Sequence, residues 1–368
     1  MNLERPSFVV PSVQELVKGK ITEIPQRYIR NDITITSLEE EEHDSDSMAK
    51  YTIPVINIER LLSGQSVSAD SEIEKLHSAC KDWGFFQVVN HGISSSVVEK
   101  IKLEIHNLFE LPIDEKNKLR QKPGEQEGFG QLFVVSDYQK LDWADLLFIT
   151  TLPIEMRKPH LFDGIPLPLR EALEAYSVGL KTLTMNLLGK MAKALKVDYN
   201  EIGELFNDCS QRMRLNYYPP CPMSEKVLGL SPHSDGGGLT ILLQLNETEG
   251  LQIRKDGNWL PVKPIPDGFV VNIGDMIEIL SNGVYRSIEH RVLIHPTKER
   301  LSIASFHAAK PDAVIDPALS LIDPPNKPAL FRKETVAKYY ENFYARKLDG
   351  KSNLHCMRIQ NGQDDHSS

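Results

Sequence analysis

The sequence predicts a mainly β fold with flanking helices, of the two-sheet jelly-roll kind. From residue 212 onward, short apolar or alternating runs recur between Gly, Pro and Asn turns, at a spacing typical of a sandwich or barrel. Before them, apolar side chains recur every three or four positions over residues 168–196, which predicts one long helix. Helices therefore come first and the β core follows, which favours one integrated unit.

The order of these patterns divides the 368-residue chain into four parts. The acidic run from Glu39 to Asp46 repels itself and predicts a solvated linker. The predicted parts are an N-terminal extension with this linker (1–50), a helical and strand region (51–205), the jelly-roll core (206–312) and a C-terminal helical segment with a tail (313–368).

The region before the core contains shorter elements. β-branched residues predict a strand, apolar periodicity predicts helices, and Pro112 is expected to end the second of these helices. The expected elements are a strand at 53–58, a helix at 71–82, a strand at 85–89, a turn at 90–92 and a helix at 96–111.

The core is expected to contain about eight strands, each bounded by turn residues. Their predicted positions are 213–218, 239–245, 251–254, 259–263, 269–273, 276–280, 287–294 and 301–306.

Composition excludes several classes of function. Lys and Arg total 42 against 51 Asp and Glu, and the chain has no basic cluster, so we expect no binding to nucleic acid. No stretch approaches the ~18 apolar residues of a membrane helix, and the charged start does not resemble a signal peptide. Four cysteines without a CxxC pair agree with a reducing compartment, so a cytoplasmic location is expected, with a monomer as the expected oligomeric state.

Two histidines and one aspartate indicate a metal site. His233 and Asp235 are two positions apart, so on a strand both side chains would lie on one face. His290, on another predicted strand, would supply a third ligand. Two imidazoles and one carboxylate with open positions opposite them are the facial triad of non-haem Fe(II) oxygenases. Glycines at 236–238 would allow close backbone approach beside the metal.

Other interpretations of these residues stay open at this point. An isolated His-x-Asp pair often occurs by chance, and a single histidine is more often a core or surface residue than a ligand. A structural zinc site would need a closed tetrahedron of four ligands, whereas the sequence offers three good ones. We assign neither His91, in a predicted turn, nor His295 and His307 to the metal.

A second group of polar residues indicates an anion site. Arg300 and Ser302 share one face of a predicted strand among apolar neighbours. A guanidinium binds a carboxylate through two parallel hydrogen bonds, and a hydroxyl can satisfy a remaining lone pair. Asn216 and Tyr218, on a strand that ends in a proline-rich turn, could face the same pocket. The alternative is a surface ion pair between Arg300 and a glutamate.

Taken together, NYYPPCP at 216–222, HSD at 233–235, His290 and RLS at 300–302 resemble the plant 2-oxoglutarate/Fe(II)-dependent dioxygenases, in which HTD is commoner than HSD. Other segments are similar to the branch of senescence-related-gene-like proteins and the thebaine and codeine O-demethylases. They are PSVQEL (11–16), WGFFQVVNHG (83–92), EGFGQ (127–131), KLDWAD (140–145) and KLDGKS (347–352).

This resemblance implies a double-stranded β-helix of the isopenicillin-N-synthase-like kind. It implies an oxidoreductase that uses O₂ to hydroxylate or O-demethylate a small hydrophobic plant specialised metabolite of alkaloid, flavonoid or coumarin type, with release of succinate and CO₂. Ascorbate would serve as a reductant in vitro. The implied roles are Fe(II) binding by His233, Asp235 and His290, and 2-oxoglutarate binding by Arg300, Ser302, Tyr218 and Asn216.

Aromatic and apolar residues near these motifs are candidates for contact with the substrate. Leu146 and Phe148 alternate onto one face, and Phe306 follows Arg300 on the same predicted strand. Phe129 and Phe133 are further candidates, and a role in the core is the alternative for each of the five. An aromatic pocket would suit a planar hydrophobic substrate.

Two alternative functions remain open at this stage. The chain could be a non-catalytic small-molecule binding protein on the same jelly roll, although an intact ligand set argues against it. It could also be a related oxidase that takes electrons from ascorbate or from its substrate, and Arg300 with Ser302 argues against that.

Overall fold

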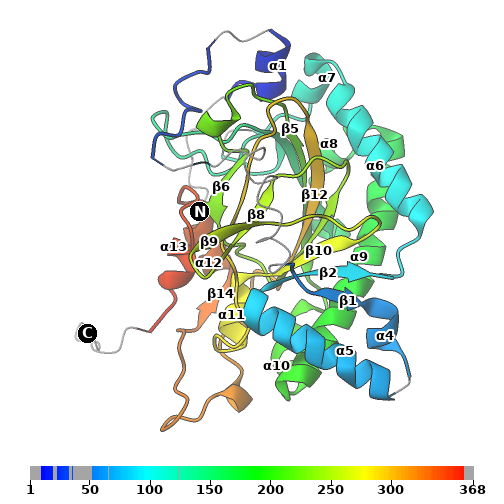
Figure 1. The fold of residues 1–368 in the computed structure, drawn as a ribbon, viewed down its shortest axis with the longest axis vertical. Coiled ribbons are helices and arrows are strands. Elements are labelled where there is room, and N and C mark those ends of the chain that lie inside the picture. The colour runs from blue at the N-terminus through cyan, green and yellow to red at the C-terminus, as the bar shows by residue number, and fades with distance from the viewer. Residues whose placement is uncertain are drawn as a thin grey trace.

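The computed structural model describes residues 10–19, 23–32, 35, 52–64, 66–122 and 124–359 (Figure 1). The predicted acidic linker from Glu39 to Asp46 lies outside the described residues. The division of the chain into four parts therefore stays a prediction. Two sheets form the centre of the fold, as predicted for a jelly roll with flanking helices.

The larger sheet has eight strands in the order β1-β2-β10-β7-β12-β5-β4-β3. Strands from before residue 206 occupy both of its edges, so the N-terminal region and the core share one sheet. Its strands are β1 (Val55–Asn57), β2 (Phe85–Val89), β3 (Gly128–Gly130), β4 (Asp145–Leu152), β5 (Ser210–Tyr218), β7 (Leu239–Gln244), β10 (Phe269–Ile273) and β12 (Arg300–Ala308).

The smaller sheet has four strands in the order β6-β11-β8-β9. Its strands are β6 (Leu230–His233), β8 (Leu251–Lys255), β9 (Asn258–Pro261) and β11 (His290–Val292). A short hairpin-like pair, β13 (Val314–Ile315) and β14 (Glu334–Thr335), lies outside both sheets and leads into the C-terminal helices.

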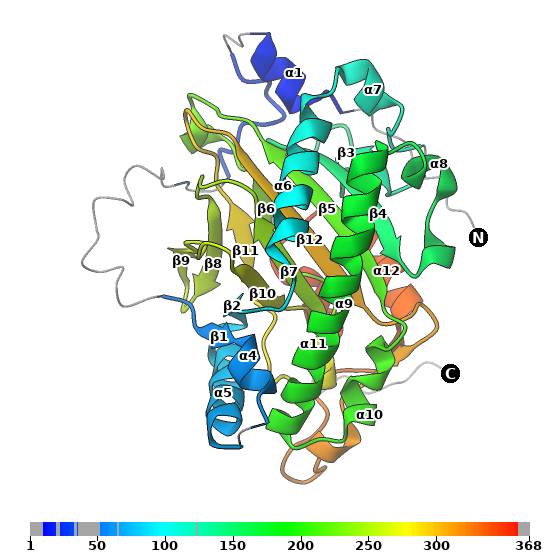
Figure 2. The same cartoon turned by 90° about the vertical axis from the view of Figure 1, so that its right-hand side faces the viewer.

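The long helix α9 (Leu167–Leu195) confirms the strongest helical prediction. Its apolar stripe is buried, and with α6 (Ser95–Glu110) it covers the outer face of the larger sheet (Figure 2). The helix ends because Lys196 adopts a left-handed conformation, with φ of 59°, and its N–H donates to the carbonyls of Ala192 and Lys193.

The remaining helices are shorter and surround the sheets. The predicted helix at 71–82 is an α-helix, α5, followed by a π-helical turn. The others are α1 (Val13–Lys18), α4 (Ile58–Leu62), α5 (Ser66–Ser78), η1 (Ala79–Trp83), α7 (Ile113–Asn117), η2 (Ile154–Met156), α8 (Pro159–Phe162), α10 (Tyr199–Ile202), η3 (Glu204–Phe206), η4 (Ser224–Lys226), α11 (Asp275–Leu280), η5 (Leu319–Leu321), α12 (Val336–Tyr344) and α13 (Ser352–His355). No helix within the described ranges is both long and apolar enough to cross a membrane.

Strand alternation decides which side chains enter the hydrophobic core and which face the space between the sheets. In β5 and β12, the residues Met213, Leu215, Leu301 and Ile303 belong to the core cluster that includes the α9 stripe. Their even-numbered neighbours face the opposite side. A fully buried Leu or Ile stabilises the fold by roughly 1.5–3 kcal/mol. The odd-numbered side chains are therefore held in the core, and the even-numbered side chains face the space between the sheets.

One predicted strand was wrong. Residues 276–280 belong to the helix α11, which begins after Gly274 and is buried on every side. A short run that is apolar all round has no amphipathic period, so its sequence does not distinguish a helix from a buried strand. The other seven predicted core strands are present, with small differences at their ends.

Candidate active site

His233, Asp235 and His290 form a cluster between the two sheets. His233 ends β6 and His290 begins β11, and the two residues are direct partners in the antiparallel register. One side-chain atom from each of the three lies within 4.8 Å of the others. Nε2 of His233 is 3.5 Å from Oδ1 of Asp235, and Nε2 of His290 is 3.8 Å from it. The structure therefore brings together the three residues that the sequence singled out.

The cluster forms in a different way from the predicted one. Strand spacing predicts that His233 and Asp235 share one face of a strand, but β6 ends at His233 and Asp235 lies in the loop that follows. The backbone holds this loop, because the N–H of Asp275 donates to the carbonyl of Asp235 at 2.7 Å. A Cβ at Gly274 would lie 2.2 Å from the carbonyl oxygen of Gly237, so this close approach requires glycine.

Hydrogen bonds aim each of the three side chains at the centre of the cluster. Nδ1 of His233 is 2.8 Å from the carbonyl oxygen of Ser231, and Nδ1 of His290 is 3.2 Å from that of Ile288. A carbonyl only accepts, so each Nδ1 carries the proton and each Nε2 lone pair faces inward. Both histidines are thus oriented as metal ligands usually are, by a partner on the other ring nitrogen.

The carboxylate of Asp235 is held in the same manner. Its Oδ2 accepts hydrogen bonds from Oγ1 of Thr240 at 2.6 Å and from Nδ2 of Asn272 at 2.7 Å. Oδ1 is left to face the two histidines. Two imidazoles and one carboxylate oxygen are the donor set of a non-haem Fe(II) facial triad, so these residues fit iron.

The protonation states also suit a metal. Burial by itself would raise the pKa of Asp235, but His290, His233 and the hydrogen bond from Thr240 outweigh it, and the pKa lies well below its ordinary value. Burial, with the adjacent His233, lowers the pKa of His290 to about 4. An ionised carboxylate and a neutral imidazole are the forms that bind a metal.

Arg300 lies deep in a cavity that includes this cluster. Its Nη1 is 3.4 Å from Oγ of Ser302, its Nη2 is 3.2 Å from Oε1 of Gln244, and its guanidinium carbon lies 5.3 Å from the centre of the Tyr218 ring. Asn216 donates to Ser302 at 3.3 Å. The four predicted cofactor residues thus line the same cavity as the three cluster residues.

The charge of Arg300 fits a bound carboxylate. Burial lowers the pKa of Arg300, and its Nε has no hydrogen-bond partner in the structure. Within the described ranges, no carboxylate forms an ion pair with it. A buried guanidinium is costly without an anionic partner, so the cavity is suited to a ligand that carries a carboxylate.

A second cavity adjoins the first, shares Arg214 and Phe306 with it, and is rich in aromatic side chains. His233 and Asp235 belong to the walls of both cavities. Three of the predicted substrate residues, Phe133, Phe148 and Phe306, line the second one. It continues along the same faces of β5 and β12 that carry the cofactor residues.

The other two predicted substrate residues lie elsewhere. Phe129 pairs in register with Leu147, which places it on the helix-covered face of the sheet, with the Lys116 ammonium 5.9 Å from its ring centre. Leu146 opposes Asn216 and shares its face, but it is buried and is not among the residues that line either cavity.

Five further residues that line the aromatic cavity are not among the predicted ones. Tyr340, Phe343 and Tyr344 of α12 form part of its wall, together with Arg212 and Arg214 of β5. Two signals were available in the sequence. The aromatic residues recur at helical spacing in YYENFY. Arg212, Arg214 and Asn216 are each two positions apart, so they share one strand face.

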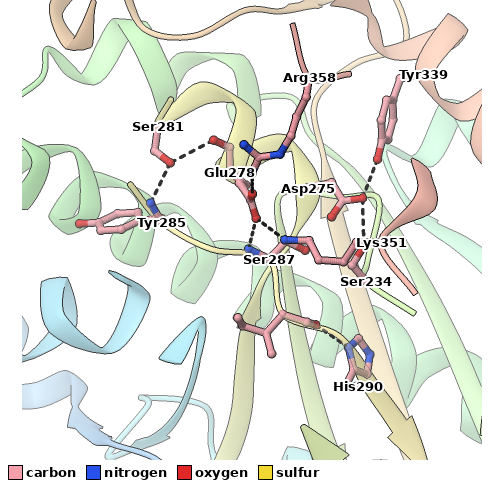
Figure 3. Close-up of polar contacts among 11 residues, drawn as sticks. Ser234, Asp275, Glu278, Ser281, Tyr285, Ser287, His290, Tyr339, Lys351 and Arg358 are labelled. Carbon is pink, nitrogen blue, oxygen red and sulfur yellow. Dashed lines mark hydrogen bonds and ion pairs between the residues drawn. The ribbon is translucent and has the colours of Figure 1, made fainter. Parts of the chain in front are cut away.

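Ion pairs to a buried glutamate hold the C-terminal segment that supplies this wall (Figure 3). Glu278 of α11 has a side chain that is 2% exposed, and it pairs with Nζ of Lys351 at 2.8 Å and with Nη2 of Arg358 at 2.9 Å. Glu278 also accepts the N–H of Ser287 at 2.7 Å. We call Glu278, Lys351 and Arg358 the C-terminal clasp.

Two further contacts join the same segment to the cluster. The hydroxyl of Tyr339 donates to Oδ2 of Asp275 at 2.7 Å, and burial raises the pKa of Asp275 to about 6. Gly350 forms backbone hydrogen bonds with Pro232 and Ser234, on either side of His233. The C-terminal segment is therefore anchored directly beside the histidine that ends β6.

Comparisons with known proteins agree with this geometry. Residues 209–309 match the family model of the 2OG-Fe(II) oxygenase superfamily, and residues 53–164 match that of the non-haem dioxygenase in morphine synthesis N-terminal. Protein SRG1 of Arabidopsis thaliana is 52% identical over 96% of this chain and 97% of its own length. The chain belongs to the 2OG-Fe(II) oxygenase superfamily.

Other relatives of this oxygenase have names that state an activity. Thebaine 6-O-demethylase of Papaver somniferum is 51% identical over 95% of this chain and 96% of its own. Oxoglutarate-dependent flavonoid 7-O-demethylase 1 of Ocimum basilicum is 49% identical, over 96% and 92%.

A solved structure supports both the fold and the cofactors. The crystal structure of JOX2 in complex with 2OG, Fe and JA superposes with a TM-score of 0.85, at 34% identity, over 97% of this chain and 100% of that one. The chain is thus a 2-oxoglutarate-dependent dioxygenase with Fe(II) and 2-oxoglutarate as its cofactors, as the sequence predicted. Like its superfamily, it uses O₂ and acts on a small molecule.

Proposed function

We propose that His233, Asp235 and His290 hold Fe(II), and that Arg300 binds the distal carboxylate of 2-oxoglutarate. The observation that carries this proposal is the arrangement in one cavity of a triad with inward-facing donor atoms and a buried guanidinium without a carboxylate partner. Ser302, Asn216 and Tyr218 line the same wall and would complete the carboxylate site.

Each group in the cavity has a role that follows from its contacts. The iron with 2-oxoglutarate supplies the activation of O₂, which no protein side chain can provide. Thr240 and Asn272 keep the Asp235 carboxylate in place, and the backbone carbonyls keep both imidazoles in one tautomer. Apolar residues around Arg300, including Leu251 and Val292, exclude water from the ion pair.

For the substrate we propose a methoxylated, planar hydrophobic plant metabolite that enters the aromatic cavity. Two relatives of similar identity are named as O-demethylases of an alkaloid and of a flavonoid, and the walls formed by Phe133, Phe148 and Phe306 suit a flat ring system. One O₂, one 2-oxoglutarate and one methyl ether would give succinate, CO₂, a free hydroxyl group and formaldehyde. Hydroxylation at carbon is the same reaction without loss of formaldehyde.

A panel of methoxylated and unmethylated flavonoids, coumarins and alkaloids tests the reaction. The Fe(II)-loaded protein is incubated with 2-oxoglutarate, O₂ and each compound, and succinate and formaldehyde are measured. We expect succinate to form in step with loss of one substrate class, with an equal amount of formaldehyde if demethylation occurs. Binding of a panel compound without succinate would favour a non-catalytic binding protein instead.

The Arg300→Ala variant should raise the KM for 2-oxoglutarate by roughly 10- to 100-fold, because a hydrogen bond to a charged group contributes about 1.5–3 kcal/mol. The kcat at saturating 2-oxoglutarate should fall much less. Arg300→Lys keeps the charge but loses the planar fork, and an intermediate KM is expected. Initial rates of succinate formation measure both constants. An unchanged KM in Arg300→Ala would remove Arg300 from the 2-oxoglutarate site.

We also propose that the enzyme acts as a monomer in the cytoplasm and binds neither nucleic acid nor membranes. The net charge of −9 and the lack of a basic cluster in the sequence support the exclusion of nucleic acid. Four unpaired cysteines agree with a reducing compartment.

A further inference from the structure

Arg212 places a positive charge on the wall of the aromatic cavity. It lies on β5 opposite Phe306 of β12 and Thr150 of β4. Arg214, two positions further along β5, shares the strand face that lines the cavity. Its guanidinium carbon is 5.6 Å from the centre of the Tyr340 ring, and it forms a side-chain hydrogen bond with Tyr344. Two tyrosines of α12 therefore position this cation.

The charge of Arg212 is not neutralised by an ion pair. Among the residues that the structure describes, no carboxylate forms one with Arg212 or Arg214, and Nε of each is buried without a hydrogen-bond partner. Glu127 acts on Arg212 through space without forming an ion pair with it, and its Oε2 accepts the N–H of Thr150 at 2.7 Å. Asp235, also on the wall, belongs to the triad.

The positive charges of Arg212 and Arg214 favour a negatively charged substrate over a positively charged one. The two guanidinium groups that line the aromatic cavity attract an anionic oxygen and repel a protonated amine. Tyr340 and Tyr344 offer ring faces and hydroxyl groups, but neither supplies a negative charge, because burial raises the pKa of both.

We propose that the substrate carries an anionic oxygen, a carboxylate or an ionised phenol, and that Arg212 binds it while the aromatic walls hold the ring system. This inference rests on the proposed function and deepens it, because it separates acidic aromatic metabolites from basic alkaloids. Arg212 is thus a specificity-determining residue of the substrate cavity, distinct from the Arg300 of the cofactor cavity.

Binding without turnover tests the inference directly. The enzyme loaded with Fe(II) and 2-oxoglutarate is titrated without O₂ in a calorimeter with matched probes. One pair is 4-methoxycinnamic acid and its methyl ester, and a second pair is 7-hydroxy-4′-methoxyflavone and 4′,7-dimethoxyflavone, at a pH that ionises the 7-hydroxyl. The amine probe is 4-methoxy-N,N-dimethylphenethylamine. The two pairs distinguish a carboxylate site from a phenolate site.

We expect at least one anionic probe to bind about tenfold more tightly than its neutral partner and than the amine, which corresponds to about 1.4 kcal/mol. Arg212→Gln should abolish this preference, and Arg212→Lys should keep part of it. The matched control is Arg170→Gln, which removes an arginine of the α9 surface that pairs with Asp163. It should leave every affinity unchanged.

Three outcomes would overturn the inference. They are equal affinity for charged and neutral probes, tighter binding of the amine, and an Arg212→Gln variant that loses thermal stability but keeps the preference. The last result would make Arg212 a structural support for α12. Failure of the proposed function is a separate observation, namely no succinate from any probe when O₂ is admitted.

Discussion

The His233→Ala variant is expected to lose Fe(II) binding and substrate-dependent succinate formation. Loss of a partner that merely orients a ligand already costs roughly 10- to 100-fold in metal affinity, so loss of the ligand itself should cost more. His233 also joins β6 to β11 at the centre of the cluster, and among the described residues the cluster contains no fourth His, Cys, Asp or Glu that could replace its Nε2. Anaerobic Fe(II) titration and succinate measurement give the two readouts.

The control for this variant is His295→Ala, which removes an imidazole from an exposed loop outside the cluster. It should bind Fe(II) and form succinate at the rate of the unmodified chain. If His233→Ala bound Fe(II) as tightly as this control, the assignment of the metal ligands would be wrong. Circular dichroism of both variants checks that the fold is retained.

Removing both cations of the C-terminal clasp should strongly destabilise the fold. In Lys351→Met/Arg358→Met, the buried carboxylate of Glu278 keeps the N–H of Ser287 but loses both positive partners. An uncompensated buried charge costs roughly 3–5 kcal/mol, so we expect a loss of at least about 3 kcal/mol in the free energy of unfolding. Denaturant titration measures it.

A third substitution separates charge from shape. Adding Glu278→Gln to the double variant removes the buried, unpaired carboxylate charge. Most of the lost free energy of unfolding should then be recovered. An exposed pair on α12, Lys338 and Glu341, supplies the control, since Lys338→Met should leave the free energy of unfolding almost unchanged. A double variant as stable as this control would mean that the clasp contributes little.

The clasp also links stability to substrate binding. It anchors α13 and the residues beyond it to α11, while the preceding helix α12 forms part of the aromatic cavity. The double variant should therefore raise the KM for the organic substrate more than the KM for 2-oxoglutarate. Arg300 and its contacts Ser302, Tyr218 and Gln244 lie on β12, β5 and β7, and none of them belongs to the C-terminal segment.

Chemical type and short spacing were enough to find the centre of the site. Arg300 and Ser302 lie two positions apart on a strand, so they share a face whatever surrounds them, and the same holds for Asn216 and Tyr218. Two histidines and an aspartate suit one class of metal. These inferences depend on local geometry and on the chemistry of side chains, both of which are written in the sequence.

The positions of Phe129 and Phe133 could not be predicted in the same way. Both belong to one short segment, yet Phe129 faces the helices and Phe133 lines the aromatic cavity. The register of β3 on β4 decides which way Phe129 faces. At Phe133 the backbone is left-handed, with φ of 61°, and this turns the chain. A shift of one residue in register would exchange the faces of a strand.

The sequence by itself determined the class of fold, the chemistry of the cofactor site and the candidate residues for it, because strand alternation, helical periodicity and ligand type are local properties. Only the tertiary structure decided that the loop after β6, rather than the strand, presents Asp235, and that α12 brings Tyr340 and Tyr344 to Arg212. Those arrangements come from contacts between segments far apart in the chain, held by backbone hydrogen bonds and by ion pairs to the buried Glu278. Local patterns carry no information about which distant segment satisfies a buried charge.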